Sequence, residues 1–554
     1  MSKHRTPNIE LMNQLSFPIL SVVTFLPLFG AFVLLFMPRR EGLIRGFALS
    51  IAVLDLLLSL PLFFAFRPEV GELQFVEKVP WFPEGGISYF LGIDGLSILL
   101  VLLTTFLSAV SILASFSIAE KVKEYMISML ILETGMVGVF VAHDLFLFYI
   151  FWEGMLIPMY FLIGIWGGVK RVYATWKFIL YTMAGSVLML VGILVLYFQG
   201  GRTFDLQALS LVQLPPTTQR WLFLAFAISF AIKVPLFPFH TWLPDAHVEA
   251  PTAGSVLLAG ILLKMGTYGF LRFALPLFPQ ASLEFAPLIA WLAIVGILYG
   301  ALVSMVQPDL KTLIAYSSVS HLGFVMLGMF AFNLQGVQGS ILQMVNHGLS
   351  TGALFLIVGI LYERLHTRMI QDMGGLWRPL PVLGAIFLIV VFSSIGLPGL
   401  NGFVGEFLIL VGAFQRKKLY GVLAALGVIL SAVYMLWMIQ RVMFGELRHP
   451  ERKSETHLYS DLTARELGSL LPVVIFCFWI GLYPRPFLER TEASAKHLLQ
   501  QIQAKQAVSR QPSALSVKMV TMFDGGCSMF DLEVPFCRGL RGSISNIENQ
   551  ASRI

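Results

Sequence analysis

The hydrophobic residues of this chain fall into about fourteen long runs that are separated by short polar stretches. The runs lie near 17–37, 43–65, 95–118, 125–142, 144–167, 173–198, 221–239, 253–274, 284–306, 312–332, 336–362, 380–414, 419–445 and 467–487. Each is long enough to cross the roughly 30 Å hydrocarbon core of a bilayer as an α-helix. The pattern therefore predicts an all-α polytopic membrane protein with about 14 transmembrane helices.

Composition supports a membrane protein and argues against redox groups in this chain. Hydrophobic residues make up 57% of the 554 residues and charged residues 13%, whereas soluble domains carry about 25% charge. The three cysteines (Cys477, Cys527 and Cys537) form no Cys-x-x-Cys pair, and no glycine-rich nucleotide loop follows a strand. We therefore expect no iron–sulfur cluster, flavin, dinucleotide or metal in this chain.

Ionisable side chains of both signs lie inside the predicted helices, where burying each one costs free energy. They are Glu133, Glu153, Lys233, Lys264, His321, His347 and Glu406. A single such residue is equally compatible with a satisfied polar group packed between helices. A set with both signs favours a pathway for ions, and we predict that these residues form a proton relay.

Two of the predicted helices carry polar residues at helical spacing. The first carries Gln343, Asn346, His347, Ser350 and Thr351, and the second carries Ser317, Ser320 and His321. In lipid, such stripes must face protein or water. One interpretation is interhelical hydrogen bonding, at roughly 0.6 kcal/mol per bond. The histidines, which titrate near neutral pH, favour the other interpretation, the wall of a hydrated proton path.

The seventh segment breaks directly after its lysine. Pro235 and Pro238 follow Lys233, and prolines at these positions are expected to free the carbonyls of Ala231 and Val234. A lysine at membrane depth costs about 2.5–3.5 kcal/mol on insertion scales. We interpret Lys233 as a switchable charge, which takes up or releases a proton when its distance from a neighbouring carboxylate changes. Glu153 is the candidate carboxylate.

A second break occurs at "SSIGLPGLNGFVGEF", where Pro398 precedes Glu406. Two interrupted helices in corresponding positions of two halves are typical of transporters built from inverted repeats. We predict two inverted five-helix repeats, each with one broken helix. The predicted parts are helices 1–3 over 1–124, the repeats over 125–274 and 284–445, a final helix within 446–490, and an extension over 491–554 whose structure the sequence does not indicate.

Residues 90–445 resemble the antiporter-like membrane subunits of respiratory NADH:quinone oxidoreductase, complex I. The resemblance rests on "FWEGMLIPMYFLIGIWGG", "KVPLFPFHTWLPDAHVEAPTAGSVLLAGILLKMGTYG", "DLKTLIAYSSVSHLGF" and "GLPGLNGFVGEF". Within that group the chain is most similar to the subunit M type, which is chain 4 in mitochondria. Glu406 carries this assignment, because the sister subunits usually have lysine at the corresponding position.

The resemblance implies a proton half-channel in each repeat and a central hydrophilic axis. In that scheme Glu153 pairs with Lys233, Lys264 relays protons through the histidine region, and Glu406 is the terminal acid near the exit. Glu133 matches a second membrane acid of the type. The resemblance also implies a proton-translocating subunit that couples electron transfer in partner subunits to pumping. Flavin, iron–sulfur clusters and quinone are expected in or at those partners, which are other membrane subunits and a hydrophilic redox arm.

Other functions remain open on the sequence. A cation/proton antiporter subunit of the Mrp type shares the fold, but it usually carries lysine where this chain has Glu406. A membrane-bound hydrogenase or a ferredoxin-dependent relative is a further alternative. A purely structural spacer would not need to bury lysines beside two helix breaks. No feature indicates nucleic-acid binding.

The distribution of Lys and Arg predicts the orientation. These residues are more frequent in the loops after odd-numbered helices, for example at Arg39, Lys121 and Lys170, although Lys417 and its neighbours run against the trend. The positive-inside rule then puts both termini on the non-cytoplasmic side. We expect a bacterial plasma membrane, because the first hydrophobic run lacks a cleavage pattern and no targeting peptide is evident.

Overall fold

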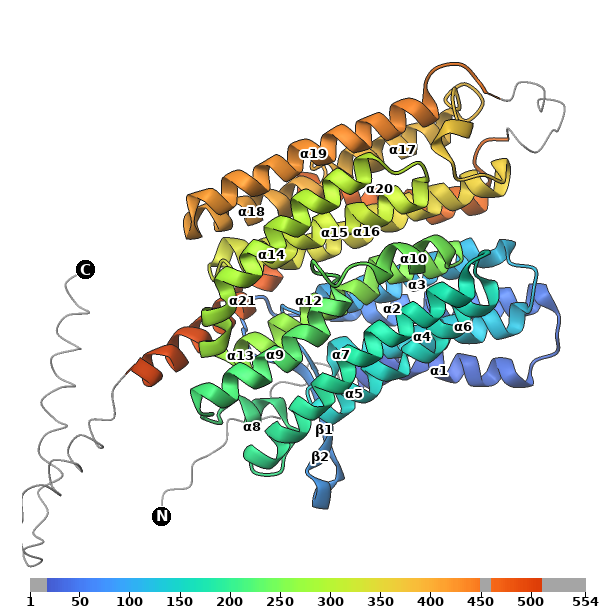
Figure 1. The fold of residues 1–554 in the computed structure, drawn as a ribbon. Coiled ribbons are helices and arrows are strands. Elements are labelled where there is room, and N and C mark those ends of the chain that lie inside the picture. Colours follow the sequence, from blue (N-terminus) through green and yellow to red (C-terminus); the bar gives the residue numbers. More distant parts are fainter. Residues whose placement is uncertain (1–16, 449–459, 511–554) are drawn as a thin grey trace, which may run out of the picture. The chain divides into compact units, whose positions relative to one another are not determined.

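The computed structural model describes residues 17–448 and 460–510, and helices form nearly all of this part of the chain (Figure 1). The chain divides into a compact unit, Met1–Ala504, and a second unit, Lys505–Ile554. The helices that are long and apolar enough to cross a membrane all belong to the first unit. The prediction of an all-α polytopic membrane protein is confirmed.

The elements of residues 17–277 include one β-hairpin. They are α1 (Ile19–Phe36), α2 (Glu41–Ala65), β1 (Gln74–Phe82), β2 (Ile87–Ile93), α3 (Ile98–Ala114), α4 (Val122–Val141), α5 (Leu145–Gly154), α6 (Leu156–Trp166), α7 (Arg171–Gln199), α8 (Leu206–Ser210), α9 (Pro216–Lys233), α10 (Trp242–Glu249), α11 (Thr252–Leu257), α12 (Leu263–Gly269) and α13 (Leu275–Leu277). Two π-helical turns, Leu258–Leu262 and Phe270–Ala274, flank α12 and join it to α11 and α13 as one continuous span.

After residue 278, the elements in the described part of the chain are all helical. They are α14 (Pro279–Met305), α15 (Leu310–Met329), α16 (Leu334–Leu365), α17 (Pro381–Ser394), α18 (Asn401–Arg416), α19 (Lys418–Met443), α20 (Ala464–Leu482) and α21 (Arg485–Arg510). Short 3-10 turns occur at Pro83–Gly85, Ser115–Ser117 and Ile370–Asp372. In Figure 1 most of the long helices run side by side, and the hairpin β1–β2 extends from one end of the helical bundle.

The described residues contain 12 helices that are long and apolar enough to cross a membrane. These helices coincide with twelve of the predicted segments. The other two predicted segments, 221–239 and 380–414, are the ones that the sequence expected to be broken. In the first, α9 ends at Lys233 and no helix follows before Trp242, and the second is divided between α17 and α18. Hydropathy therefore located the segments, and the breaks explain why two of them lack a full-length helix.

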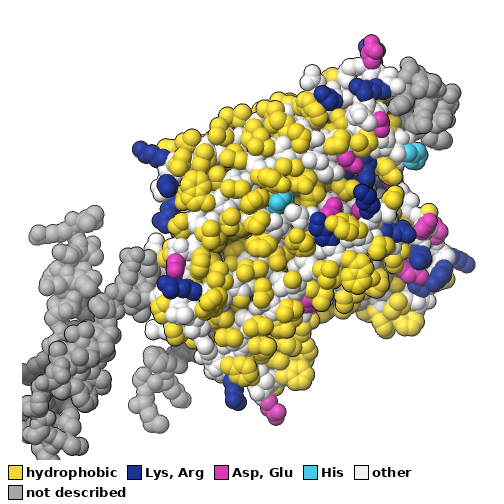
Figure 2. All heavy atoms as spheres, in the orientation of Figure 1, with side chains coloured by type: hydrophobic (Ala, Val, Ile, Leu, Met, Phe, Trp, Pro, Cys, Tyr) yellow, Lys and Arg dark blue, Asp and Glu magenta, His cyan; other side chains and the backbone are white. Residues whose placement is uncertain are grey.

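The burial of the helices separates a lipid-facing layer from a protein-facing layer. In the most apolar windows of α16 and of the span Thr252–Leu277, every residue is buried, whereas only 39% are buried in α7 and α19. Figure 2 shows hydrophobic side chains covering the middle of the visible face, with charged side chains gathered toward its ends. This distribution fits a belt in contact with lipid. The polar stripe on α16 consequently faces protein, as predicted.

The break after Lys233 differs in detail from the expectation. The helix α9 ends at Lys233, and α10 begins only at Trp242, so the predicted helical segment 221–239 extends too far. The carbonyl of Ala231 is not free, because it accepts a hydrogen bond from the Leu236 amide at 2.8 Å. The Ile232 carbonyl accepts one from the Trp242 indole at 2.8 Å. The sharp turn after the helix thus supplies local donors that the sequence reading overlooked.

The second break joins α17 to α18 through glycines. Gly396 and Gly399 have φ values of +74° and +93°, a region that disfavours residues with a Cβ atom. A Cβ at Gly396 would lie 2.9 Å from Oε2 of Glu406. Glycine at this position therefore lets the Glu406 carboxylate pack directly against the broken segment.

Two regions depart from what the sequence suggested. The hairpin β1–β2 lies between the second and third predicted helices, where no strand was expected. The helix α21 continues to residue 510, so the first part of the extension over 491–554 is helical. Its Ser494 hydroxyl accepts a hydrogen bond from the Gly95 amide at 2.9 Å, which ties α21 to the turn before α3. Residues 511–554 lie outside the described part of the chain.

Candidate functional site

Lys264 lies at the centre of a buried span whose helical register is disturbed on both sides. It is in α12, between the two π-helical turns. Its ammonium group donates a hydrogen bond to the Ala259 carbonyl, which belongs to the preceding π turn. Such turns occur often at functional sites, because they release backbone groups from the helix ladder. Here a carbonyl of the π turn accepts the hydrogen bond of the lysine.

Lys264 is in direct contact with the first histidine of the predicted relay. Its Nζ lies 2.6 Å from Nδ1 of His347 on α16. Both side chains are buried, with exposed fractions of 0% and 2%. A protonated lysine donates in this hydrogen bond and a neutral imidazole accepts. The contact is therefore a ready path for moving a proton between the two residues.

The second histidine contacts the acid at the second helix break. His321 on α15 has its Nδ1 atom 2.9 Å from Oε1 of Glu406 on α18. The same carboxylate oxygen accepts a hydrogen bond from Nε2 of Gln343 at 3.0 Å. All three side chains are buried. The carboxylate of Glu406 is thus held by two donors from two helices.

The two hydrogen-bonded pairs face each other across the histidines. The ring centroids of His321 and His347 are 5.8 Å apart. The Nε2 atoms of both rings have no hydrogen-bond partner in the structure. The two rings are thus not joined by a direct hydrogen bond, and water molecules commonly bridge polar groups that are separated in this way. A proton moving from Lys264 to Glu406 has this gap as its only interruption.

The remaining residues of the α16 stripe serve a different purpose. Asn346 donates to the Asn401 carbonyl at 2.7 Å, at the start of α18. The Ser350 hydroxyl donates to the Asn346 carbonyl at 2.9 Å. The Asn346–Asn401 contact is therefore the interhelical hydrogen bonding that the sequence left as an alternative, whereas the Ser350 bond stays within α16. The histidine of the stripe instead contacts Lys264.

Lys233 and Glu153 are neighbours but do not form an ion pair in this structure. The Lys233 ammonium group is buried, has no hydrogen-bond partner, and lies 5.3 Å from the ring centroid of Trp152 and 5.7 Å from that of Phe178. Glu153 is half-buried, and its charge acts on Lys233. The expected ion pair between Glu153 and Lys233 is consequently not formed here, and the Lys233 ammonium group lies near aromatic rings instead.

Glu133 is not part of the Lys264–Glu406 chain. It lies on α4, and the charged group that acts on it most directly is the carboxyl of Asp55 on α2. Sequence reasoning selected Glu133 but passed over Asp55, although Asp55 interrupts the apolar run of the second predicted helix. Asp55, like Glu133, is an acidic residue within a predicted membrane helix, so the same criterion could have found it.

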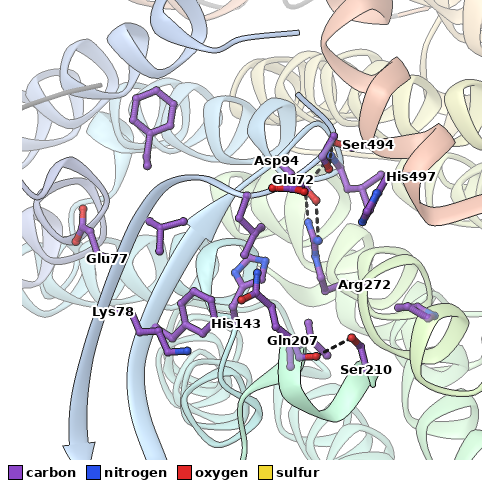
Figure 3. Close-up of a pocket in the computed structure, with 18 of the residues that line it drawn as sticks. Glu72, Glu77, Lys78, Asp94, His143, Gln207, Ser210, Arg272, Ser494 and His497 are labelled. Carbon is purple, nitrogen blue, oxygen red and sulfur yellow. Dashed lines mark hydrogen bonds and ion pairs between the residues drawn. The ribbon is translucent and has the colours of Figure 1, made fainter. Parts of the chain in front are cut away.

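A pocket of about 930 Å³, with charged side chains in its wall, opens beside the hairpin and was not predicted (Figure 3). At its wall Arg272 binds the carboxylate of Asp94 through both terminal nitrogens, with Nη1 2.7 Å from Oδ2. Arg272 also donates from Nε to the Tyr268 hydroxyl at 3.0 Å. Arg272 follows Lys264 on the same span, in the second π turn.

The ion pair controls the charges at this pocket. Burial alone would raise the pKa of Asp94, but the Arg272 guanidinium more than offsets that effect and leaves the pKa below its ordinary value. Burial lowers the pKa of the neighbouring His143 to about 4, and the positive charge of Arg272 adds to the shift. His143 is therefore neutral at physiological pH, and the pocket wall carries one closed ion pair.

The described residues contain no group of three or more His, Cys, Asp and Glu side chains that could hold a metal ion. His247 stacks on Phe355 with ring centroids 4.7 Å apart, and His240 stacks on Phe237 at 5.6 Å. These two histidines of the conspicuous "FHTWLPDAH" motif are accordingly packed against rings.

Two family models match the chain. Residues 142–433 match the family "NADH:quinone oxidoreductase/Mrp antiporter, TM", and residues 73–138 match "NADH-ubiquinone oxidoreductase chain 4, amino terminus". NADH-quinone oxidoreductase subunit M of Rhodobacter capsulatus is 47% identical over 513 residues, which cover 90% of this chain and 99% of that protein. The chain belongs to the subunit M (chain 4) family of NADH:quinone oxidoreductase.

Further relatives of the subunit M family agree. NADH-ubiquinone oxidoreductase chain 4 of Marchantia polymorpha is 47% identical over 484 residues, covering 87% of this chain and 97% of that one. A chain of respiratory complex I from Thermus thermophilus superposes with a TM-score of 0.80 at 35% identity, over 87% of this chain and 99% of that chain. A chain of the Mrp complex from Dietzia shares the fold, with a TM-score of 0.78 at 22% identity.

Membership of the subunit M family confirms the predicted resemblance and the predicted function. The chain is a membrane proton-pumping subunit of NADH:quinone oxidoreductase, and it acts as part of respiratory complex I with other subunits. Membrane subunits of this kind carry no redox cofactors. The chain is a multi-pass protein of a bacterial or mitochondrial respiratory membrane.

Proposed function

We propose that protons move through this subunit along Lys264, His347, His321 and Glu406, and that Glu153 and Lys233 control this movement. The observation that supports the route most strongly is the pair of buried contacts, Lys264–His347 at 2.6 Å and His321–Glu406 at 2.9 Å, which face each other across the histidine gap. Glu133 contributes a further proton-binding position away from this route.

The physical step is an exchange of protons between groups of different charge. A protonated Lys264 passes a proton to His347, which is already its hydrogen-bond acceptor. The proton then crosses the 5.8 Å gap between the rings, and the Glu406 carboxylate stabilises the positive charge that arrives on His321. Because the surroundings are buried, this stabilisation is stronger than it would be in water.

The control step uses the break after α9. When Glu153 lies close to Lys233, its negative charge offsets the positive charge of Lys233, and Lys264 can hold a proton. When Glu153 and Lys233 separate, the positive charge of Lys233 repels the proton on Lys264. The helices that carry the two lysines are in close contact, since a Cβ on Gly266 of α12 would lie 2.8 Å from both the Phe230 carbonyl and the Val234 amide. A shift at the break is therefore transmitted to α12.

The proposed architecture consists of fourteen membrane segments in which two inverted repeats cover 125–274 and 284–445. The three preceding helices occupy 1–124, and a final helix lies within 446–490. The positions of the breaks support this division: one follows Lys233 in the first repeat, and the other precedes Glu406 in the second. Each repeat would then contribute one interrupted helix to the transport route.

The proposed setting is a bacterial plasma membrane, with both termini on the non-cytoplasmic side. The partners would be neighbouring antiporter-like membrane subunits and, through them, the hydrophilic redox arm with its flavin and iron–sulfur clusters. Electrons would pass from NADH to quinone in those partners. This chain would contribute only ion movement.

The route is tested with a double-mutant cycle on the two histidines in the purified complex, reconstituted into vesicles. We expect His321→Ala and His347→Ala each to lower the number of protons pumped per electron, and the double variant to lower it no further than the worse single one. Residues on one route are strongly non-additive, whereas independent sites add. Additive losses, or an unchanged ratio in both single variants, would contradict the route. His366→Ala, in the loop after α16, is the matched control.

A further inference from the structure

A second group of buried polar atoms lies between α2, α3 and α4, apart from the lysine–histidine chain. Asp55 on α2 and Glu133 on α4 are both fully buried, with 0% of each side chain exposed. Their carboxyl groups are close enough for each to act electrostatically on the other. None of their four oxygens has a hydrogen-bond partner in the structure. The two acids thus face each other without any group that satisfies them.

The helices α3 and α4 carry further buried hydroxyl groups. Ser108 and Ser111 on α3 and Thr134 on α4 are buried, and their hydroxyl oxygens likewise have no hydrogen-bond partner. The Ser108 hydroxyl is directed at Glu133. Buried polar atoms are nearly always satisfied in folded proteins, so two buried carboxyl groups without hydrogen-bond partners mark a site that binds something.

The charges decide what this site binds. In the described part of the chain, neither carboxyl forms an ion pair with a basic side chain. Two adjacent carboxylates cannot both remain ionised in such surroundings, because each loses its hydration and repels the other. Sharing a proton removes one negative charge and converts the repulsion into a hydrogen bond, as in other paired acids.

We propose that Asp55 and Glu133 form a proton-binding site in which one proton is shared between the two carboxyl groups, with the Ser108 hydroxyl as a third partner. The proton sits as an O–H on one carboxyl and is donated to the carboxylate of the other. Asp55, Glu133 and Ser108 are at most 1% exposed, so a bare proton reaches the site more easily than a hydrated metal ion. The role of the site in turnover rests on the proposed function, whereas the shared proton does not.

The test is infrared difference spectroscopy of the purified complex in H₂O and in D₂O, in the region where protonated carboxyl groups absorb. We expect Asp55→Asn and Glu133→Gln each to remove the same single band, which shifts in D₂O. The double variant should remove nothing more. Ser108→Ala should shift this band without removing it, which keeps the test usable if an acid variant does not assemble. Glu84→Gln, on the exposed hairpin turn, is the control.

Three results would overturn the proposal. Unchanged spectra in both single variants would mean that both acids are ionised. Loss of two different bands would mean that each acid holds its own proton. Sodium-dependent loss of the band, with ²²Na⁺ binding that both variants abolish, would identify a cation site. If the proton route through Lys264 and the histidines proved wrong, the infrared band of the shared proton would still be present. The two proposals can therefore be contradicted independently.

Discussion

The two broken helices place ionisable groups of opposite sign in very different surroundings. At the first break, Lys233 is buried without a hydrogen-bond partner and lies over two aromatic rings. At the second break, Glu406 accepts hydrogen bonds from His321 and Gln343. A buried charge without a hydrogen-bond partner carries a desolvation cost that movement toward a partner would relieve, whereas a hydrogen-bonded charge has less to gain from moving. The comparison suggests that the first break is the moving element and the second the fixed acceptor.

Removal of the moving charge has the largest expected effect. Lys233→Ala eliminates the only positive charge that the break after α9 presents to Lys264, so proton pumping by this subunit should be lost. The measurement is the number of protons pumped per electron in vesicles. Lys311→Ala is the matched control, because this buried lysine instead donates to the Ala250 carbonyl at 2.5 Å and should matter less. Equal losses in both variants would remove the distinction between the two regions.

Removal of the fixed charge is expected to have a large but smaller effect. Glu406→Gln keeps the shape of the side chain and an oxygen that accepts from Gln343, but it no longer stabilises a positive charge on His321. A loss of as little as about 1.4 kcal/mol of such stabilisation slows a step roughly tenfold. We expect at least that decrease in coupled NADH oxidation, measured in tightly sealed vesicles, with a smaller change after an uncoupler is added. A variant with normal coupled rates would show that the acid is dispensable.

The smallest expected effect on pumping concerns the pocket beside the hairpin, where the change is in stability and not in proton transfer. The pKa of His143 in the folded chain is about 4, against an ordinary value of 6.5. Between those two values the unfolded state binds more protons, so stability falls as the pH drops from 6.5 toward 4, by roughly 3 kcal/mol in full. His143→Gln should flatten this part of the curve of Tm against pH. The lowered pKa of Asp94 affects stability only below about pH 4, so its contribution can be distinguished from that of His143. Parallel curves would contradict this assignment.

Features that follow from local sequence were predictable, and features that depend on distant partners were not. Hydropathy located the membrane segments, and prolines located both breaks. Asp94 and Arg272 are 178 positions apart, and no periodicity indicates that they meet. The helix α21 is mostly polar and was therefore overlooked, because its contacts depend on the turn before α3.

Within the candidate site, the sequence identified the residues but not their connections. Lys264, His347, His321 and Glu406 come from four helices, and only the packing of those helices shows which pairs touch. Whether Glu153 and Lys233 form an ion pair depends on the conformation, so the absence of this pair in the structure could not be predicted from residue types. Asp55 was visible in the sequence, but its meaning depends on Glu133 lying opposite.

The most direct test of the central claim is the number of protons pumped per electron by the complex carrying Lys264→Ala. The ammonium group of this lysine contacts both the Ala259 carbonyl and His347. The account predicts a lower ratio, with electron transfer from NADH to quinone retained when the membrane potential is dissipated. An unchanged ratio, measured in vesicles of equal tightness, would contradict the proposed route.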